Sequence, residues 1–275
     1  MFVRVWGARG SISVAREDTV VYGGHTTCVE IRAGERLIIV DAGSGIRSLG
    51  KSLMAQEKGP VDADIFLSHT HLDHIAGLLM FEPFFKKKNV FRIHGPRSRS
   101  GKAIKDTIEA FFVHDYWPIG ISSLTAATEW RDLEEGTYDM GGGLTVKTLL
   151  LEHPAPVLGY RFEYGGKSVA LVFDHESYAP GNARVIPFLQ GADLVVFDSQ
   201  YTEEEYFNGK QGWGHSSFEG AIATTEKAGV KKTLLFFHHD PDRTDEALAA
   251  LEKKYAKKST IEHVYAAKEN AVYEV

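Results

Sequence analysis

The segment His69-Thr70-His71-Leu72-Asp73-His74 most constrains what this chain can fold into. It places three imidazoles and one carboxylate directly after the apolar run 65–67, which predicts a buried strand. A strand that ends there projects these side chains into the space beyond its tip. Imidazole nitrogens and carboxylate oxygens are ligands of Zn²⁺ and similar divalent ions. The segment therefore predicts a metal site at one edge of a sheet.

Three further apolar runs are each followed by a histidine or an aspartate. These residues are His153, Asp174 and His238. A site for two metal ions needs about seven protein ligands, of which the His-rich segment supplies four. Because strands fix ligand positions better than loops do, these three residues are the candidates for the remaining places. A strand-terminal polar residue that merely meets water is the alternative for each of them.

Two of these positions have a neighbour that competes for the same role. His239 adjoins His238, and only one of the two can point into a site from the end of a strand. His175 adjoins Asp174, but the alternation of side chains along a strand points it elsewhere.

Alternating and continuous apolar runs predict many strands in both halves of the chain, with helices expected over 46–55, 75–81, 98–112, 217–228 and 244–255. Two β-rich halves with helices predict an α/β (α+β) protein in which two sheets pack face to face. Residues 132–136 and 141–143 are expected to be loops. The chain has no low-complexity linker, so we expect one domain over residues 1–275.

Composition narrows the functional class of this 275-residue chain. A net charge of −6 argues against broad, nonspecific binding to nucleic acid. Cys28 is the single cysteine, so no intramolecular disulfide can form, and we expect it to be a buried thiol. The N-terminal residues lack the plan of a signal peptide, and no apolar run approaches the ~18 residues that cross a bilayer. We therefore expect a cytoplasmic protein that does not enter membranes.

His-Thr-His-Leu-Asp-His, together with the three later residues, resembles the pattern of the metallo-β-lactamase superfamily of hydrolases. The resemblance implies a four-layer αββα sandwich with two divalent metal ions at one edge. It assigns three ligands to the first ion, namely His69, His71 and His153. It assigns three to the second, namely Asp73, His74 and His238, and lets Asp174 bridge both. Zn²⁺ suits these ligands, and Mn²⁺ or Fe fits them too.

The same resemblance bears on two further residues. The family's Thr-His-Leu-Ser-Pro pattern favours His238 over His239. Asp41, which follows the apolar run 37–40, matches an aspartate that supports the His-rich loop from behind.

Gly212-Trp213-Gly214-His215-Ser216-Ser217 is similar to the His-Ser-Thr motif of the phosphodiesterase branch, which includes the tRNA 3′-end-processing endonuclease and small cyclic-phosphate phosphodiesterases. That likeness implies that metal-bound hydroxide, oriented by Asp73, attacks phosphorus. His215, held by Asp198, then protonates the departing alkoxide. A histidine that only caps a helix or packs is the alternative for His215.

The substrate is less constrained by the sequence. The Gly- and Lys-rich arm of the tRNA-processing members has no counterpart here, so a small phosphodiester, cyclic nucleotide or cyclic phosphate is favoured over tRNA. Hydrolysis of a carboxyl ester, lactone or thioester is the alternative on the same metals, and relatives imply a homodimer as one assembly.

Three other features remain open at this level. Two basic clusters, Lys86–Lys88 and Arg97 with Arg99 and Lys102, suit a phosphate-rich ligand or a solvated surface. The aromatic segment 111–118 suits a lid or the core. His25 stands where similar sequences carry Asn.

Overall fold

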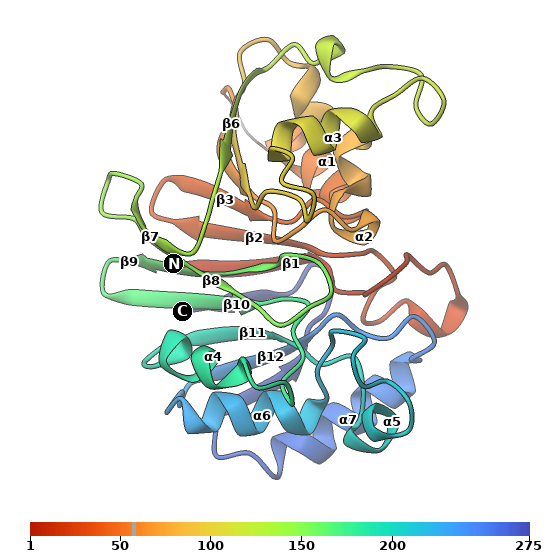
Figure 1. Cartoon of the computed structure of the whole chain (residues 1–275), viewed down its shortest axis with the longest axis vertical. Coiled ribbons are helices and arrows are strands. Elements are labelled where there is room, and N and C mark those ends of the chain that lie inside the picture. The colour runs from red at the N-terminus through yellow and green to blue at the C-terminus, as the bar shows by residue number, and fades with distance from the viewer. Residues whose placement is uncertain (57–58) are drawn as a thin grey trace.

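The computed structural model describes residues 1–56 and 59–275 of the chain. Its two seven-stranded sheets lie against each other in the middle of Figure 1. The first sheet contains, in spatial order, β14 (Val272–Glu274), β1 (Phe2–Gly7), β2 (Cys28–Ala33), β3 (Arg36–Val40), β4 (Asp62–Phe66), β5 (Val90–Gly95) and β6 (Ala127–Asp132). The second contains β13 (His263–Ala266), β12 (Thr233–Phe237), β11 (Leu194–Asp198), β10 (Lys167–Val172), β9 (Leu158–Tyr164), β8 (Thr145–Leu150) and β7 (Gly136–Asp139).

Helices cover the outer face of each sheet (Figure 1). The first sheet is covered by α1 (Ile46–Gln56) and α3 (Ile104–Phe111), with the short α2 (Leu72–Ile75) at its edge. The second carries α4 (Asn182–Leu189), α5 (Glu203–Phe207), α6 (Phe218–Lys227) and α7 (Asp245–Ala256). The layer order is helix, sheet, sheet, helix, which confirms the predicted αββα sandwich.

Strand alternation explains why the layers stack. In β3, Ile38 and Val40 face the core between the sheets, whereas Leu37 and Ile39 face the core beneath α1. The strands β10, β11 and β12 divide their side chains in the same way between the central core and the core beneath α6. Because successive side chains point to opposite faces, a continuous apolar strand fills two cores at once.

Strand direction decides where polar residues collect. In the first sheet β3, β4, β5 and β6 are parallel, and β1 runs the same way because it is antiparallel to β2. In the second sheet β10, β11, β12 and β13 are parallel, and β8 shares their direction. The carboxyl ends of these strands therefore meet at one edge of each sheet.

Several local expectations need correction. The helix expected over 98–112 begins only at Ile104, because residues 98–102 form a turn in which Gly101 has φ +81°. The helix expected over 75–81 is α2 followed by the 3₁₀ turn Ala76–Met80. Of the loop expected over 132–136, Asp132 ends β6 and Gly136 begins β7.

Among the α-helices and strands of the described residues, those not predicted are β6, β7, α4 and α5. Cys28 is buried as expected. Across the described ranges 1–56 and 59–275, no helix is long and apolar enough to cross a membrane.

Candidate active site

The structure brings all seven predicted ligand residues together at the shared edge of the two sheets. Four of them lie on the loop and helix α2 that follow β4. The other three follow β8, β10 and β12, and these are His153, Asp174 and His238. Their donor atoms form two groups, each with all atoms within 4.8 Å of one another.

The first group joins His69, His71 and His153 to one oxygen of Asp174. Asp174 Oδ2 lies 3.6 Å from His69 Nε2 and 3.8 Å from His153 Nε2. His71 Nδ1 lies 3.4 Å from His153 Nε2. Three imidazole nitrogens and one carboxylate oxygen thus surround one point, which is a donor set that suits a divalent cation.

The second group contains Asp73, His74 and His238. Asp73 Oδ2 lies 3.2 Å from the Nε2 atoms of both histidines. The other oxygen of Asp174, Oδ1, lies 3.2 Å from His74 Nε2 and 3.3 Å from His238 Nε2. Asp174 therefore stands between the two groups, with one oxygen toward each.

The backbone at this edge is unusual. Asp41, Asp174 and His238 follow β3, β10 and β12, and all three have positive φ, at +61°, +45° and +61°. The loop after β1 contributes Ser11, at +64°. These are four of the five non-glycine residues with positive φ in the described part of the chain. Strained backbone of this kind is concentrated at functional sites.

Buried partners hold several of the imidazoles from behind. Asp41 Oδ2 lies 2.7 Å from His74 Nδ1, so it directs Nε2 of that ring toward the cluster. Ser68 donates its backbone N–H to Asp41 Oδ1 at 2.6 Å, and its Oγ lies 3.1 Å from His69 Nδ1. His153 donates from Nδ1 to the carbonyl oxygen of Gly214 at 2.9 Å.

Unpaired atoms in the cluster fit a pair of cations. His69 Nε2, His74 Nε2 and Asp174 Oδ1 are buried and lie 3.2–3.6 Å from oppositely charged atoms of the cluster, yet none of these contacts among the described residues has the geometry of a hydrogen bond. A buried polar atom without a partner is costly, so this convergence calls for a ligand. The donor set of nitrogen and carboxylate oxygen matches Zn²⁺ and its neighbours in the first transition series.

The protonation of the metal-free cluster follows from its charges. Burial, with the nearby His74 adding to it, lowers the pKa of His69 well below its ordinary value. Burial also opposes charge on His74 and His238, but the facing carboxylates outweigh it. The pKa of His74 is raised well above its ordinary value, and the pKa of His238 is raised to about 9. Despite burial, the neighbouring histidines lower the pKa values of Asp73 and Asp174.

His215 and Asp198 form a pair beside the cluster. His215 Nδ1 lies 2.8 Å from Asp198 Oδ2, and Asp198 ends β11. The His215 ring stacks on the ring of His238, with centroids 4.7 Å apart, and its centroid lies 5.4 Å from that of His153. His215 also lines a hollow of about 420 Å³ together with Asp73 and Asp174, so its free nitrogen is available to a ligand there.

The loop that carries His215 is fixed at both ends. Ser217 caps α6, since its side chain accepts a hydrogen bond from the N–H of Gly220. Gly212 and Gly214 donate their N–H groups to the carboxylate of Glu176 at 2.8 and 3.2 Å. The loop thereby places His215 beside the candidate metal ligands His153 and His238.

Sequence reasoning missed Gly10 and Ser11. Ser11 lines the same hollow, and its N–H donates to Asp73 Oδ2 at 2.8 Å. Gly10 packs so closely on His238 that a β-carbon would lie 2.2 Å from Nδ1. Both follow β1, a strand that ends at this edge like the others, although only its pairing in the sheet shows this.

The competing histidines point away from the cluster. His239 Nε2 lies 2.9 Å from the carbonyl oxygen of Ala267, and burial lowers its pKa to about 3. His175 Nε2 lies 3.0 Å from Asn182 Oδ1, as alternation predicted. His25 lies 3.2 Å from Ser44 Oγ and lines a neighbouring hollow instead.

The aromatic segment 111–118 is divided between core and surface. Phe112 is buried and Trp117 packs against the core beside α3, whereas Tyr116 is 75% exposed. Within the described chain, none of these residues lines the hollow at His215.

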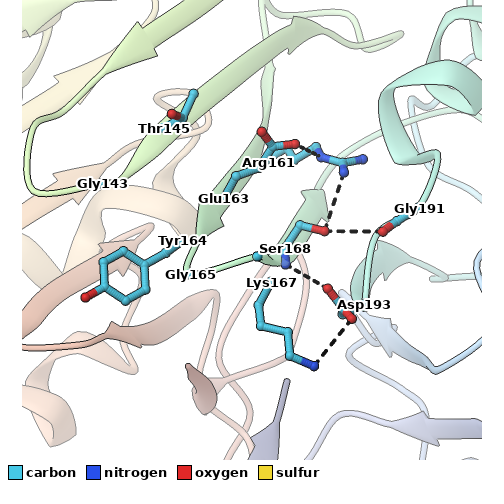
Figure 2. Close-up of a pocket in the computed structure, with 11 residues that line it drawn as sticks. Gly143, Thr145, Arg161, Glu163, Tyr164, Gly165, Lys167, Ser168, Gly191 and Asp193 are labelled. Atoms are coloured by element: carbon cyan, nitrogen blue, oxygen red, sulfur yellow. Dashed lines mark hydrogen bonds and ion pairs between the residues drawn. The ribbon is translucent and has the colours of Figure 1, made fainter.

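A separate hollow, shown in Figure 2, lies at the β9–β10 hairpin. Its charged groups are already paired. Arg161 Nε donates to Glu163 at 2.8 Å, and Asp193 receives the backbone N–H of Ser168 at 2.9 Å and lies 3.8 Å from Lys167 Nζ. Because these charges are paired and the turn glycines have no side chains, the structure of the hairpin accounts for this hollow.

Comparison with known proteins adds to this geometry. The family described as "Beta-lactamase superfamily domain" matches residues 36–239, which include the ends of β3, β4, β8, β10, β11 and β12. The chain belongs to the metallo-β-lactamase superfamily. Its members share the two-sheet sandwich found here, and the predicted hydrolase class is confirmed at this level.

Individual relatives of this superfamily member are distant. It is 24% identical over 297 residues to ribonuclease Z of Thermoplasma acidophilum, covering 90% of each chain. Its fold matches the metallo-β-lactamase fold protein YhfI of Bacillus subtilis, with a TM-score of 0.73, 20% identity and coverage of 100% and 99%. A diphosphatase of the PhnP family matches with a TM-score of 0.70, 16% identity and coverage of 100% and 97%.

Proposed function

We propose that this protein is a metal-dependent phosphodiesterase that hydrolyses a small phosphodiester. The seven clustered residues would hold two divalent cations, with Asp174 shared between them. The cations would supply an activated water and would neutralise charge on the phosphate oxygens. A superfamily fold with two metals does not decide the substrate, so the choice of reaction rests on other residues.

The pairing of His215 with Asp198 carries the proposal. Asp198 binds Nδ1 of His215 and leaves Nε2 facing the hollow, which is the arrangement of a general acid. An alkoxide is a poor leaving group, so a phosphodiester gains from such an acid. Water adds to phosphorus and gives one proton to solvent, the bond to the ester oxygen breaks, and that oxygen takes the proton of His215.

Asp73 lines the same hollow as His215, and we assign it to the attacking water. One of its oxygens receives the N–H of Ser11 and approaches His74 and His238. The residue also lines the hollow, so it can orient an attacking water in line with the leaving group. In this assignment Asp73 acts on the attacking water, and His215 acts on the departing oxygen.

The names of similar proteins leave two substrate classes open, and two observations favour a small substrate. Relatives are named ribonuclease Z, and a fold neighbour is a diphosphatase, so both nucleic acid and small molecules are candidate substrates. The β8–β9 connection over residues 151–157 is short, and the described ranges hold no protruding Gly- and Lys-rich arm. The net charge of −6 also disfavours an extended polyanion.

The test varies the leaving group. Thymidine 5′-(p-nitrophenyl phosphate) releases a phenolate that needs little protonation, whereas a dinucleotide releases an alkoxide. We expect zinc-loaded or manganese-loaded protein to hydrolyse both. His215→Ala lowers the rate on the dinucleotide by ~10²–10⁴-fold and lowers the rate on the nitrophenyl ester far less.

Metal content measured on the same samples provides the control. Equal losses on both substrates with full metal content would refute the acid role of His215. Turnover of lactones or thioesters, with none of either phosphodiester, would select the carboxyl-ester alternative instead.

A further inference from the structure

We propose that the substrate carries a second phosphate group, which binds Arg99 in a hollow next to the metal cluster. This inference rests on the proposed phosphodiesterase function and narrows its substrate class. The hollow measures about 350 Å³, which is within the range of small-molecule sites. It is lined in part by His69, Thr70 and His71, so it opens directly onto the candidate metal ligands.

The hollow adjoins the catalytic hollow, because two residues line both of them. These shared residues are Thr70 and His71. A molecule whose phosphodiester lies beside His215 can therefore extend past His71 into the second hollow. The two hollows together describe a substrate longer than one phosphodiester group.

Charge in the second hollow is concentrated on one residue. Arg97 is neutralised, because its Nη2 lies 2.6 Å from Asp132 and its Nη1 donates to the carbonyl oxygen of Gly101. Arg99 has no carboxylate partner among the described residues, and its one contact is a long 3.5 Å approach to the carbonyl oxygen of Pro154. An exposed guanidinium beside a concave wall presents its donors to a phosphate in a planar fork.

The walls of the hollow suit a planar, weakly polar group. Pro96 comes from the loop after β5, and Pro154 and Pro156 come from the β8–β9 connection, so both sheets contribute. Proline rings are rigid and have no N–H to satisfy, so they offer apolar faces at low entropic cost. Arginine and proline together favour a phosphorylated nucleoside over an alkyl phosphate.

The experiment compares substrates that differ only in that phosphate. The dinucleotide UpU has one phosphodiester, and its 5′- and 3′-phosphorylated forms add one terminal phosphate each. We expect at least one phosphorylated form to show a kcat/KM about tenfold or more above that of UpU. Arg99→Gln should remove this advantage and leave UpU and bis-p-nitrophenyl phosphate unchanged.

A matched variant and a binding measurement complete the test. Arg131→Gln removes the same charge from an exposed arginine on β6 outside the hollow, and it should keep the advantage. Calorimetric titration of the metal-free protein with uridine 5′-monophosphate should show binding that Arg99→Gln weakens about tenfold, and uridine should bind equally weakly to both.

The outcomes separate the two proposals. Turnover of bis-p-nitrophenyl phosphate without any advantage for phosphorylated UpU, or with an advantage that survives Arg99→Gln, overturns the Arg99 site alone. Absence of turnover of every phosphodiester overturns the proposed function, while Arg99-dependent nucleotide binding would still support the site.

Discussion

Nδ1 of His153 donates a hydrogen bond to the carbonyl oxygen of Gly214, the residue immediately before His215. A candidate metal ligand on the loop after β8 is thereby joined to the loop that carries the candidate acid. Gly214 has φ +86°, and a β-carbon there would lie 2.1 Å from His153 Nδ1. The geometry of the candidate metal site and that of the candidate acid therefore depend on one another.

We expect Gly214→Ala to weaken zinc binding by ~10–100-fold, because the added methyl displaces the ring of His153. Competition with a chromogenic chelator measures the affinity. Gly212→Ala is the matched control, since Gly212 has φ +77° but open space around its β-carbon position. The Gly212→Ala variant therefore introduces backbone strain without a side-chain clash. Full zinc affinity in Gly214→Ala would contradict the coupling, and so would equal losses of affinity in both variants.

Zinc binding should release protons at neutral pH. His74, whose pKa is raised well above its ordinary value, and His238, with a pKa of about 9, hold protons at pH 7 in the metal-free protein. Coordination displaces those protons. Because His238 loses its proton unaided as the pH rises through about 9, the number released should fall there. Titration calorimetry in buffers of different ionisation enthalpy measures it, and a release that is absent at pH 7 would contradict the protonated cluster.

Asp41→Asn should lower metal affinity by ~10–100-fold without removing a candidate ligand. The carboxylate of Asp41 lies 2.7 Å from Nδ1 of the buried His74 and fixes which nitrogen faces the cluster. Asparagine has nearly the same shape but can present its amide group, which would favour the wrong ring tautomer. Zinc affinity and the far-ultraviolet circular dichroism of the variant should be measured together. Unchanged affinity in a folded variant would show that Asp41 does not support the site.

Asp64 should stabilise the fold by a pH-dependent amount, far from the active edge. His94, Arg92 and Arg36 surround its buried carboxylate at 2.9–3.0 Å and, against burial, hold its pKa well below the usual range. The contribution is therefore full above the unfolded value of ~3.9 and is lost as the pH falls toward the folded value. Asp64→Asn should cost on the order of 3 kcal/mol of unfolding free energy at pH 7 and less at pH 3.5.

Urea unfolding at the two pH values measures that difference. Asp62→Asn serves as the control, because Asp62 contacts Arg92 from the surface, with a side chain that is 64% exposed. It should change stability little at either pH. A cost for Asp64→Asn that is the same at pH 7 and pH 3.5 would rule out the carboxylate as its source.

The positions of the clustered residues were predictable because the apolar pattern marks where buried strands stop. His153, Asp174 and His238 each end such a run, and parallel strands place their carboxyl ends at one edge. Ser11 follows β1 by the same logic, but β1 reaches this edge through two antiparallel pairings, which the sequence does not display.

Two of the missed elements, β6 and α4, lacked a distinctive pattern. In β6, exposed residues alternate with half-buried ones, so its sequence Ala-Thr-Glu-Trp-Arg-Asp shows no apolar face. The helix α4 contains Pro187, which reads as a helix breaker. The short α5 did carry a signal, because Thr202 and Glu205 form a capping box at its start.

The cluster draws residues from the loop after β4 in one sheet and from β8, β10 and β12 in the other. Neither sheet holds a complete set by itself, so tight zinc uptake can begin only once the two halves have docked. A cation bound there would link the two sheets to each other. Zinc capture during refolding would then report the final assembly step and not the earlier formation of either half.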